Sequence, residues 1–398
     1  MQTDTPYLFV EINFSNYIFV AGTYDKNQNL KIIEKIAIRN EGSINNKFTN
    51  FEQAHNVIKK NIQTIEDKLN YVFKDVIVIL DNFCLSCINI SAFKKLNGSQ
   101  LMKENISYIL NSLKLAVTEN EKEKTILHIF NSGSILDETR IENLPIGLFG
   151  DFYSHELTFF LIKDNDLKNI KLIFNKNNLN VKKVLIKNFI ECTQLIDDKD
   201  KIKTFFKIKI NKDNSNLSFF DKASFKYSEN FNFGSDIIFK DIMKVCSIDN
   251  ESIKKILLEQ FKDKVFEESE LLETKYFGQG NFRKIKKQLI LDIVNARIEE
   301  ITNIIFNKNI NLDSFKQGNV RIYLIIEDRI IFDNFKENFS TYFSKHYNFD
   351  IHLVDGFRIE ESIISASSIT NYGWEKEAIP ITQIKNSLIA RIFKSLFG

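Results

Sequence analysis

The sequence is poor in residues that break regular structure and in residues that build disulfide frameworks. Of its 398 residues, three are proline, thirteen are glycine and four are cysteine. Four cysteines without a secretory signal peptide predict a reduced, cytoplasmic protein. No apolar run approaches the roughly 18 residues of a membrane-spanning helix. The 54 basic and 52 acidic residues leave a net charge of +2, which gives no general attraction to nucleic acid.

The usual arrangements of metal-binding and catalytic side chains are also missing. Cys84 and Cys87 have the spacing of a metal-ligand pair, but no second pair or nearby histidine completes a zinc site. The five histidines are scattered, and no Gly-x-Ser-x-Gly turn presents a serine nucleophile. We therefore expect no metal site and no catalytic residues, and we predict that the protein is not an enzyme.

The apolar pattern predicts an α/β fold built in two halves. Three strands within residues 7–37 are followed by a helix at Phe51–Leu69 and a fully buried strand at Asp75–Leu80. The second half opens at about residue 201 with another strand hairpin and contains a long helix at about 282–306. Two halves that each begin with a hairpin imply a duplicated architecture with a cleft between them.

A stretch of different character interrupts the first half at about 82–162. It is predicted to contain a helix at about 99–114 and strands at 125–130 and 157–162, around the turn Asn143-Leu-Pro-Ile-Gly-Leu-Phe-Gly150. A strand at 184–190 returns the chain to the first layer. This order of elements is typical of a small α+β subdomain inserted into an α/β layer.

The C-terminal residues 384–397 show the clearest helical periodicity. Large apolar side chains recur at helical spacing, accompanied by Lys385, Arg391 and Lys394 and by no acidic residue. Fourteen helical residues reach only about 21 Å, too short to span a bilayer core. Two interpretations are open from the residues alone: a last helix packed on the protein's own core, or a basic amphipathic helix lying in a membrane interface.

Three turns that follow predicted strands lack the glycines that phosphate binding usually requires. They are Glu11-Ile-Asn-Phe-Ser-Asn-Tyr17, Lys209-Ile-Asn-Lys-Asp-Asn214 and Leu324-Ile-Ile-Glu-Asp-Arg329. Glycine is favoured in such turns because backbone N–H groups must point at the phosphate and let it approach closely. Phe14 and Lys212 would instead bring side chains to the phosphate positions, and Glu327 would repel a phosphate.

In chain order, these features resemble FtsA, the family of actin-like bacterial division proteins that tether FtsZ filaments to the cytoplasmic membrane. The turn that ends at Gly150 is similar to the family's Asn-Pro-x-Gly-x-x-Gly turn, with Leu144 as an extra residue. Leu291-Asp-Ile-Val-Asn-Ala-Arg-Ile-Glu-Glu-Ile301 is similar to the family's long helix in the second lobe. The paired hairpins and the amphipathic tail also match, so the resemblance covers nearly the whole chain.

The resemblance implies a two-lobed actin-like (ribonuclease H-like) α/β fold with a small α+β subdomain inserted in the first lobe and a C-terminal amphipathic helix. The implied division is 1–81 and 163–200 for the first lobe, 82–162 for the inserted subdomain, 201–234 and 307–355 for the core of the second lobe, 235–306 for its helical subdomain, 356–373 for a return to the first lobe, 374–383 for a linker and 384–398 for the membrane-targeting helix.

The family's ATP-binding turns are altered here. Asp-Ile-Gly-Thr-Ser is replaced by Glu11-Ile-Asn-Phe-Ser15, and Asp-Ile-Gly-Gly-Gly-Thr by the segment from Lys209 to Asn214. The family's Thr-Gly-Gly becomes Ile325-Ile-Glu327. We therefore expect weak or no ATP binding and no cofactor, with degenerate turns at Glu11, Asn13, Phe14, Ser15, Asn211, Lys212, Asp213, Asn214 and Glu327.

The resemblance also implies partners. In the family, the C-terminal peptide of FtsZ docks on the helical subdomain, which implies Arg297 as a contact with Lys286 and Lys287 as companions. The tail implies binding to an anionic membrane surface. The expected place is the cytoplasmic side of the bacterial inner membrane at the division ring, with self-association open and no nucleic acid partner. The implied membrane contacts are Ile384, Lys385, Leu388, Ile389, Arg391, Ile392, Phe393, Lys394, Leu396 and Phe397.

Two other functions stay open. One is an actin-like adaptor of another membrane assembly, of the pilus inner-membrane platform type. The other is an ATPase or sugar-kinase-like enzyme of the same superfamily, which the glycine-free turns argue against.

Overall fold

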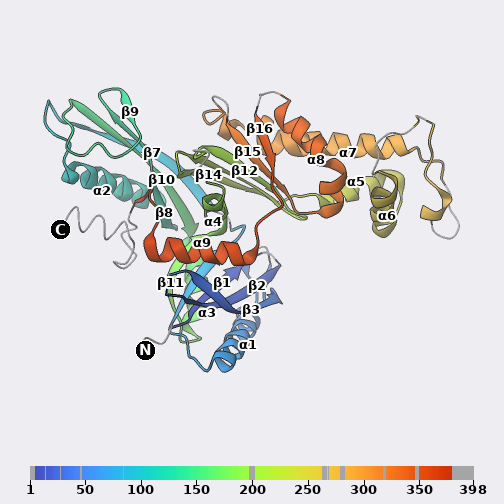
Figure 1. Ribbon diagram of the computed structural model, residues 1–398, viewed down its shortest axis with the longest axis horizontal. Coiled ribbons are helices and arrows are strands. Elements are labelled where there is room, and N and C mark those ends of the chain that lie inside the picture. The colour runs from blue at the N-terminus through green and yellow to red at the C-terminus, as the bar shows by residue number, and fades with distance from the viewer. Residues whose placement is uncertain are drawn as a thin grey trace. The chain divides into compact units, whose positions relative to one another are not determined.

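The computed structural model describes residues 5–13, 15–26, 28–44, 47–83, 85–196, 202–261, 267, 269–277, 283–316, 320–345 and 349–378. The chain divides into two compact units (Figure 1). The first comprises 1–203, 220–228 and 357–398, and the second comprises 204–219 and 229–356. The predicted subdomain boundaries within these units stay predictions.

A mixed five-stranded sheet with the order β11-β6-β1-β2-β3 forms the centre of the first unit. Strands β1, β6 and β11 run parallel, and β1, β2 and β3 form an antiparallel meander. The predicted strand at Asp75–Leu80 is confirmed as β6, and all but its first residue are buried. The strands are β1 (Tyr7–Ile12), β2 (Asn16–Tyr24), β3 (Leu30–Arg39), β6 (Asp75–Leu80) and β11 (Asn180–Ile186), with a separate two-stranded pair of β4 (Ser43–Ile44) and β5 (Lys47–Phe48).

Helices pack on both faces of this sheet. Helices α1 (Phe51–Leu69) and α3 (Asp164–Asn175) contact each other on one side, and α4 (Lys187–Gln194) contacts α9 (Ile359–Tyr372) on the other (Figure 1). Helix α1 has the predicted bounds because Asn50 caps its first turn and Asn70 ends it in a left-handed conformation. Its buried residues are those of the apolar stripe: Ala54, Ile58, Ile62 and Ile65.

The inserted subdomain is an antiparallel sheet with the order β17-β8-β10-β7, and β9 also pairs with β8. Helix α2 (Lys103–Asn120) covers one face of this sheet, and its apolar residues share a core with Leu157 and Phe159. The strands are β7 (Leu85–Lys95), β8 (Lys124–Leu136), β9 (Thr139–Ile141), β10 (Phe152–Lys163) and β17 (Glu377–Ala378).

Two sequence predictions in the first unit were wrong in their bounds, and one strand was missed. The helix predicted at about 99–114 begins at Lys103, because Leu101 N–H instead donates to the carbonyl of Leu148 at 2.8 Å. The strand predicted at 184–190 ends at Ile186, and the apolar run continues into helix α4. Strand β7 was not predicted, although Ile88, Ile90 and Ala92 alternate with polar residues.

The second unit is built around the sheet β14-β13-β12-β15-β16, in which β12, β15 and β16 are parallel. The predicted hairpin is β12 and β13. The long helix predicted at about 282–306 begins only at Lys287, since residues 283–286 are not helical, and it gives way after Thr302 to a π-helical turn, Asn303–Asn307. The strands are β12 (Phe205–Ile210), β13 (Ser215–Asp221), β14 (Ser224–Phe231), β15 (Arg321–Ile326) and β16 (Asp350–Leu353), and the helices are α5 (Asp236–Cys246), α6 (Asn250–Gln260), α7 (Lys287–Thr302) and α8 (Arg329–Ser344), with 3-10 turns at Thr274–Tyr276 and Ile310–Leu312.

Candidate functional site

Three neighbouring parallel strands of the first sheet end side by side, each next to a charged residue. Glu11 is the penultimate residue of β1, Asp81 follows β6 and Lys187 follows β11. The carboxyl ends of parallel strands meet at one edge of a sheet, which is where α/β proteins commonly bind ligands. This edge is therefore the first place to look for a site.

The three charges at this edge form a closed cluster. Lys187 Nζ lies 2.6 Å from Glu11 Oε1 and 3.3 Å from Asp81 Oδ2. Burial on its own lowers the pKa of the Lys187 ammonium, but the carboxylates of Asp81, Glu11 and Glu191 outweigh it and raise that pKa above its ordinary value. Lys187 therefore stays charged and acts as the internal counter-ion of the carboxylates around it.

The turn between β1 and β2 is closed by its own asparagine. Asn13 Oδ1 accepts hydrogen bonds from the backbone N–H of Ser15 at 3.0 Å and of Asn16 at 2.7 Å. The Asn13 side-chain amide donates to Glu11 Oε1 at 3.0 Å. The two backbone donors that could face a phosphate are thus bonded within the turn. Phe14 lies outside the described residues.

An equivalent strand end in the second unit also carries an ion pair. Lys209, near the end of β12, places its ammonium 2.9 Å from the carboxylate of Glu327, which follows the parallel neighbour β15. The Lys209 side chain is buried, whereas half of the Glu327 side chain is exposed. Here too an ammonium occupies the edge where strand ends converge.

The turn after β12 packs directly on the start of helix α5. The N–H groups of Ser235 and Asp236 donate to the carbonyls of Asn211 and Lys212 at 2.9 and 3.0 Å. A Cβ at Gly234 would lie 2.1 Å from the Asn211 carbonyl oxygen, so glycine is needed for this close approach. The Lys212 ammonium lies 4.0 Å from Asp236, and Asn211 donates to Asn214 at 2.6 Å. Burial raises the pKa of the Asp236 carboxyl, and the neighbouring Asp213 adds to that rise. The N–H groups of Ser235 and Asp236 are therefore also bonded within the unit.

The two turns are the positions where the resemblance to FtsA places ATP and Mg²⁺. A phosphate cradle needs backbone N–H groups that face the ligand, and Mg²⁺ needs carboxylate oxygens open to it. Here the N–H groups of Ser15 and Asn16 are bonded to Asn13, and the Glu11 carboxylate is bonded to Lys187. The residues present do not fit a nucleotide with its metal.

Sequence reasoning singled out Glu11 and Glu327 but missed their partners. Lys187 and Asp81 each come directly after the last residue of a buried apolar strand. That position is a usable signal, because it lies at the ligand-binding edge of a parallel sheet. It was hidden at Lys187 because the strand was predicted to run on to residue 190.

The predicted peptide-contact residues lie on or beside α7, and two of them, Arg297 and Lys287, are paired with carboxylates. Arg297 forms ion pairs with Asp241 and, at 2.6 Å, with Glu300, and about a fifth of its side chain is exposed. Lys287 is buried and paired with Glu270. Lys286 precedes the helix and is exposed. The FtsZ-peptide assignment stays a prediction, and the exposure of these side chains favours Lys286 and Arg297 over Lys287.

A shallow depression follows Arg297 along the same helix and its π-helical turn. The depression is lined by two glutamates, an asparagine, a lysine, an alanine and an exposed isoleucine. The lining residues are Ala296, Glu299, Glu300, Asn303, Ile304 and Lys308.

Two sequence features receive no further support within the described residues. The tail 384–397 lies outside them, as does Cys84. Burial raises the pKa of the Cys87 thiol to about 12, as for an inert core cysteine. Over the described part of the chain, no cluster of three or more potential ligands could hold a metal ion, and no helix is long and apolar enough to cross a membrane.

Comparisons with known proteins identify the fold. No family model and no curated protein matches the sequence. Among solved structures, a chain of a PilM–PilN type IV pilus biogenesis complex is similar over 93% of this chain and 96% of its own, with 9% identity and a TM-score of 0.54. MreB5 of Spiroplasma citri bound to AMPPNP is 9% identical over 92% and 96% of the two chains, with a TM-score of 0.46. EutJ of Carboxydothermus hydrogenoformans is 9% identical over 92% and 90%, with a TM-score of 0.43.

The predicted fold class is confirmed: the chain has an actin-like α/β fold. The similarity to the PilM–PilN chain carries this conclusion, because it covers nearly all of both chains. At 9% identity it concerns the fold alone, and nothing in the comparisons singles out FtsA.

Proposed function

We propose that the protein is a non-enzymatic adaptor with an actin-like fold, which holds a protein assembly at the cytoplasmic face of a bacterial membrane. The observation that carries the proposal is the contact of Lys187 with Glu11 and Asp81. This contact turns the ligand-binding edge of the first sheet into an internal salt bridge. A protein with an actin-like fold whose nucleotide position is filled in this way would act by binding other proteins and a membrane, and not by hydrolysing a nucleotide.

Membrane attachment rests on the amphipathic pattern of residues 384–397. Each basic residue near an anionic surface contributes about 1 kcal/mol, so Lys385, Arg391 and Lys394 support reversible binding. Large apolar residues add the burial that an interfacial helix needs. Self-association would strengthen attachment through avidity.

The partner we propose is the C-terminal peptide of FtsZ, so the protein would help to assemble the division ring. The support is the resemblance of the Asn143–Gly150 turn, the long helix and the tail to the FtsA family. A partly acidic peptide would meet Lys286 and would compete with Asp241 and Glu300 for Arg297. Binding would therefore exchange internal ion pairs for intermolecular ones.

A second candidate function is an adaptor in a pilus-type membrane assembly. It is favoured by the similarity to the PilM–PilN chain, which has a TM-score of 0.54. In this case the partner would be a peptide of an inner-membrane pilus protein rather than FtsZ. Both candidates predict the same membrane attachment.

Flotation with anionic liposomes distinguishes these functions. The full chain and a chain that stops at Gln383 are each mixed with FtsZ from the same organism. The adaptor proposal predicts that FtsZ floats only with the full chain. Flotation of the full chain without FtsZ would favour the pilus-type candidate, and no flotation of either chain would contradict membrane attachment.

A matched pair of tail variants separates apolar insertion from simple charge. Replacing Phe393 and Leu396 by glutamate removes two apolar contacts and adds two negative charges. Replacing Ser387 and Ala390 by glutamate adds the same charge on the opposite side of the predicted helix. The first variant should stay in solution, while the second should retain more binding. Equal loss in both would mean that electrostatics alone drives attachment.

A further inference from the structure

The inserted sheet has one face that is only half covered. Helix α2 packs on one side, and side chains on the other side alternate with those that face α2. On this second face, the carbonyl of Lys226 in β14 accepts hydrogen bonds from Cys87 and Asn89, which covers the first half of β7. Beyond Asn89, the side chains of β7 on this face are exposed, namely Ser91, Phe93 and Lys95.

The uncovered half of this face bears large exposed apolar side chains. Phe93 is 69% exposed and Phe152 52%, and Ile135 on β8 is 40% exposed. Strand pairing places Phe93, Ser154 and Ile135 in one row across the sheet, and Lys95 and Phe152 in the next row. Exposed apolar groups in adjacent rows are a common sign of a binding surface.

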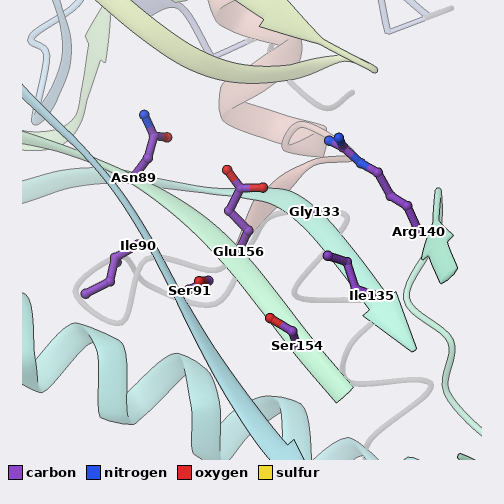
Figure 2. A pocket seen from close by; sticks show the side chains of 8 residues that line it. All are labelled: Asn89, Ile90, Ser91, Gly133, Ile135, Arg140, Ser154 and Glu156. Carbon is purple, nitrogen blue, oxygen red and sulfur yellow. The ribbon is translucent and has the colours of Figure 1, made fainter. Parts of the chain in front are cut away.

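A depression of about 210 Å³ lies in the same face. Small residues form its floor, namely Ser91, Gly133 and Ser154, and Glu156 and Arg140 stand at its sides (Figure 2). The Glu156 carboxylate lies over Gly133, where a Cβ would come within 2.7 Å of it. The depression is therefore a product of small side chains on three adjacent strands, and it can take one apolar side chain.

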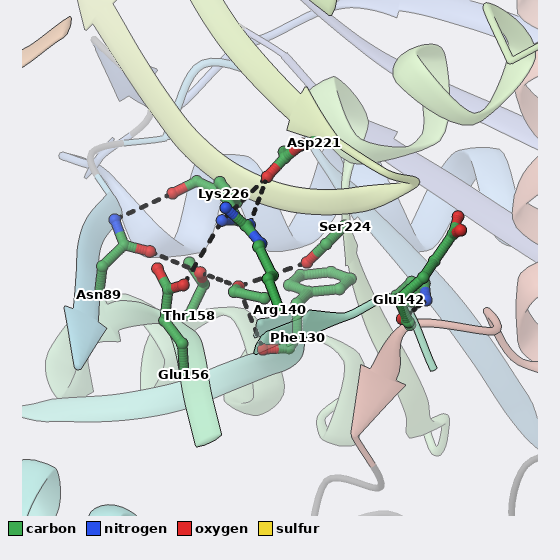
Figure 3. Close-up of polar contacts among 11 residues, drawn as sticks. Asn89, Phe130, Arg140, Glu142, Glu156, Thr158, Asp221, Ser224 and Lys226 are labelled. Carbon is green, nitrogen blue, oxygen red and sulfur yellow. Dashed lines mark hydrogen bonds and ion pairs between the residues drawn. The ribbon is translucent and has the colours of Figure 1, made fainter. Parts of the chain in front are cut away.

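The charges beside the depression are balanced by one another. Lys226 lies 3.6 Å from Glu156 and 3.1 Å from Asp221, and Arg140 lies 3.0 Å from Asp221 (Figure 3). This relay of alternating charges fixes the walls of the depression. It leaves Lys95 as the charge at the far end of β7 that a ligand on this face would meet, while Lys94 points to the other face, over the Tyr108 ring of α2.

Strand β7 is an open edge of this sheet. It pairs with β10 along all eleven of its residues without a register shift, and no described strand pairs with its other side. It contains no proline and no acidic residue, and it ends in Lys94 and Lys95. Natural proteins usually blunt long regular edges with bulges, prolines or charges along their length. Here the two lysines protect only one end.

We propose that β7 is a docking edge for an extended acidic peptide of a partner protein, which adds to the sheet as a strand. The peptide would run antiparallel to β7, with apolar side chains toward Phe93 and the depression and acidic residues opposite Lys94 and Lys95. Main-chain hydrogen bonds would supply affinity, and the alternate side chains would supply specificity. The proposal is independent of the function proposed for the tail.

A designed peptide tests the proposal on the full chain. The probe is a fluorescent peptide of about ten residues, the length of a long strand, with alternating valine and threonine and two aspartates at its N-terminal end. A control peptide carries two lysines instead. Binding by anisotropy should be about tenfold tighter for the aspartate peptide, because its acidic residues lie opposite Lys94 and Lys95, whereas the lysines of the control peptide are repelled there.

Charge reversal on the protein provides the matched test. In Lys94→Glu/Lys95→Glu the preference should invert, so that the lysine peptide binds more tightly. N-methylation of the peptide amides that face β7 should abolish binding, whereas methylation of the opposite edge should not. Both lysines lie on the edge strand β7, and circular dichroism checks that the variant is folded.

Three outcomes would overturn the proposal. One is binding of neither peptide at millimolar concentration, and another is equal binding of both peptides to the protein and its variant. The third is a dimer of the full chain that the charge-reversed variant dissociates while no peptide binds, because the edge would then belong to a second copy.

Discussion

The ammonium of Lys187 and the carboxylate of Glu11 are 2.6 Å apart, although the two residues are 176 positions apart in the chain. Glu11 is fully buried, and its second oxygen, Oε2, has no hydrogen-bond partner among the described residues. The Glu11 carboxylate therefore depends on the Lys187 ammonium to balance its charge. The strand order brings the ends of β1 and β11 to the same edge of the sheet, and the contact between Lys187 and Glu11 fills the position where a nucleotide would bind.

Replacing Lys187 by methionine should strongly destabilise the protein. Removing one partner of a buried ion pair leaves the other charge uncompensated, which typically costs about 3 to 5 kcal/mol. Urea unfolding followed by circular dichroism measures the change. Lys168→Met, on an exposed position of α3, is the matched control and should change stability by less than about 0.5 kcal/mol. Similar small effects of both variants would mean that the salt bridge carries no stability.

Replacing Asn13 by alanine should loosen the turn after β1 at a smaller cost. The variant loses the acceptor for Ser15 and Asn16 and the donor to Glu11. The expected loss of stability is about 0.5 to 1.5 kcal/mol, the net contribution of a typical hydrogen bond, because the turn is partly exposed and water can replace the lost contacts. Hydrogen exchange at the Ser15 and Asn16 amides is the direct readout. Unchanged protection of both amides would contradict the proposed role of Asn13.

Glu377 should make stability depend on pH in the acid range. Burial raises the pKa of this carboxyl, but Lys183 and His128 outweigh it and hold the pKa at about 2, below its ordinary 4.5. The stabilisation is present above pH 4.5 and is lost as the pH falls from 4.5 toward 2. Its size is on the order of 3 kcal/mol.

The variant Glu377→Gln isolates this contribution. The buried His155, whose pKa is lowered to about 4, also costs the folded state stability as the pH falls below 6.5. The comparison with wild type removes that background. The difference in the free energy of unfolding between the two proteins should be large at pH 7 and should shrink as the pH falls below 4.5. A difference that does not vary with pH would contradict the assignment.

Replacing Arg297 by glutamate should weaken binding of the FtsZ peptide about tenfold, since one favourable charge contact becomes repulsive. Fluorescence anisotropy with a labelled peptide measures the affinity. Lys255→Glu, exposed on α6, changes the net charge equally and should leave the affinity unchanged. If both variants bind as wild type does, the peptide docks elsewhere.

The sequence allowed most of the fold to be predicted because its apolar periods are strong. Helix α1 and strand β6 were predicted with the observed bounds. Strand β7 was missed because only three apolar side chains, Ile88, Ile90 and Ala92, alternate toward α2. Most side chains on the other face of the strand are exposed. An open edge strand has a weak signal, because little of it is buried.

The site could be predicted only in part. The missing glycines pointed to altered turns, and Glu11 and Asn13 were named. Which carboxylates Lys187 pairs with could not be read from local sequence, because the contact depends on the pairing of β1, β6 and β11. The ion pair of Arg297 with Asp241 likewise joins helices α7 and α5 through residues that are 56 positions apart in the chain.

Whether the actin-like fold of this protein still binds a nucleotide can be measured by isothermal titration of the full chain with ATP and Mg²⁺. We expect no measurable binding at millimolar nucleotide, because Lys187 neutralises Glu11 and Asp81 and the N–H groups of Ser15 and Asn16 are bonded to Asn13. A dissociation constant in the micromolar range would contradict this expectation. That result would show that the turns open to a nucleotide, and the protein would then have to be treated as a nucleotide-regulated member of the actin-like fold.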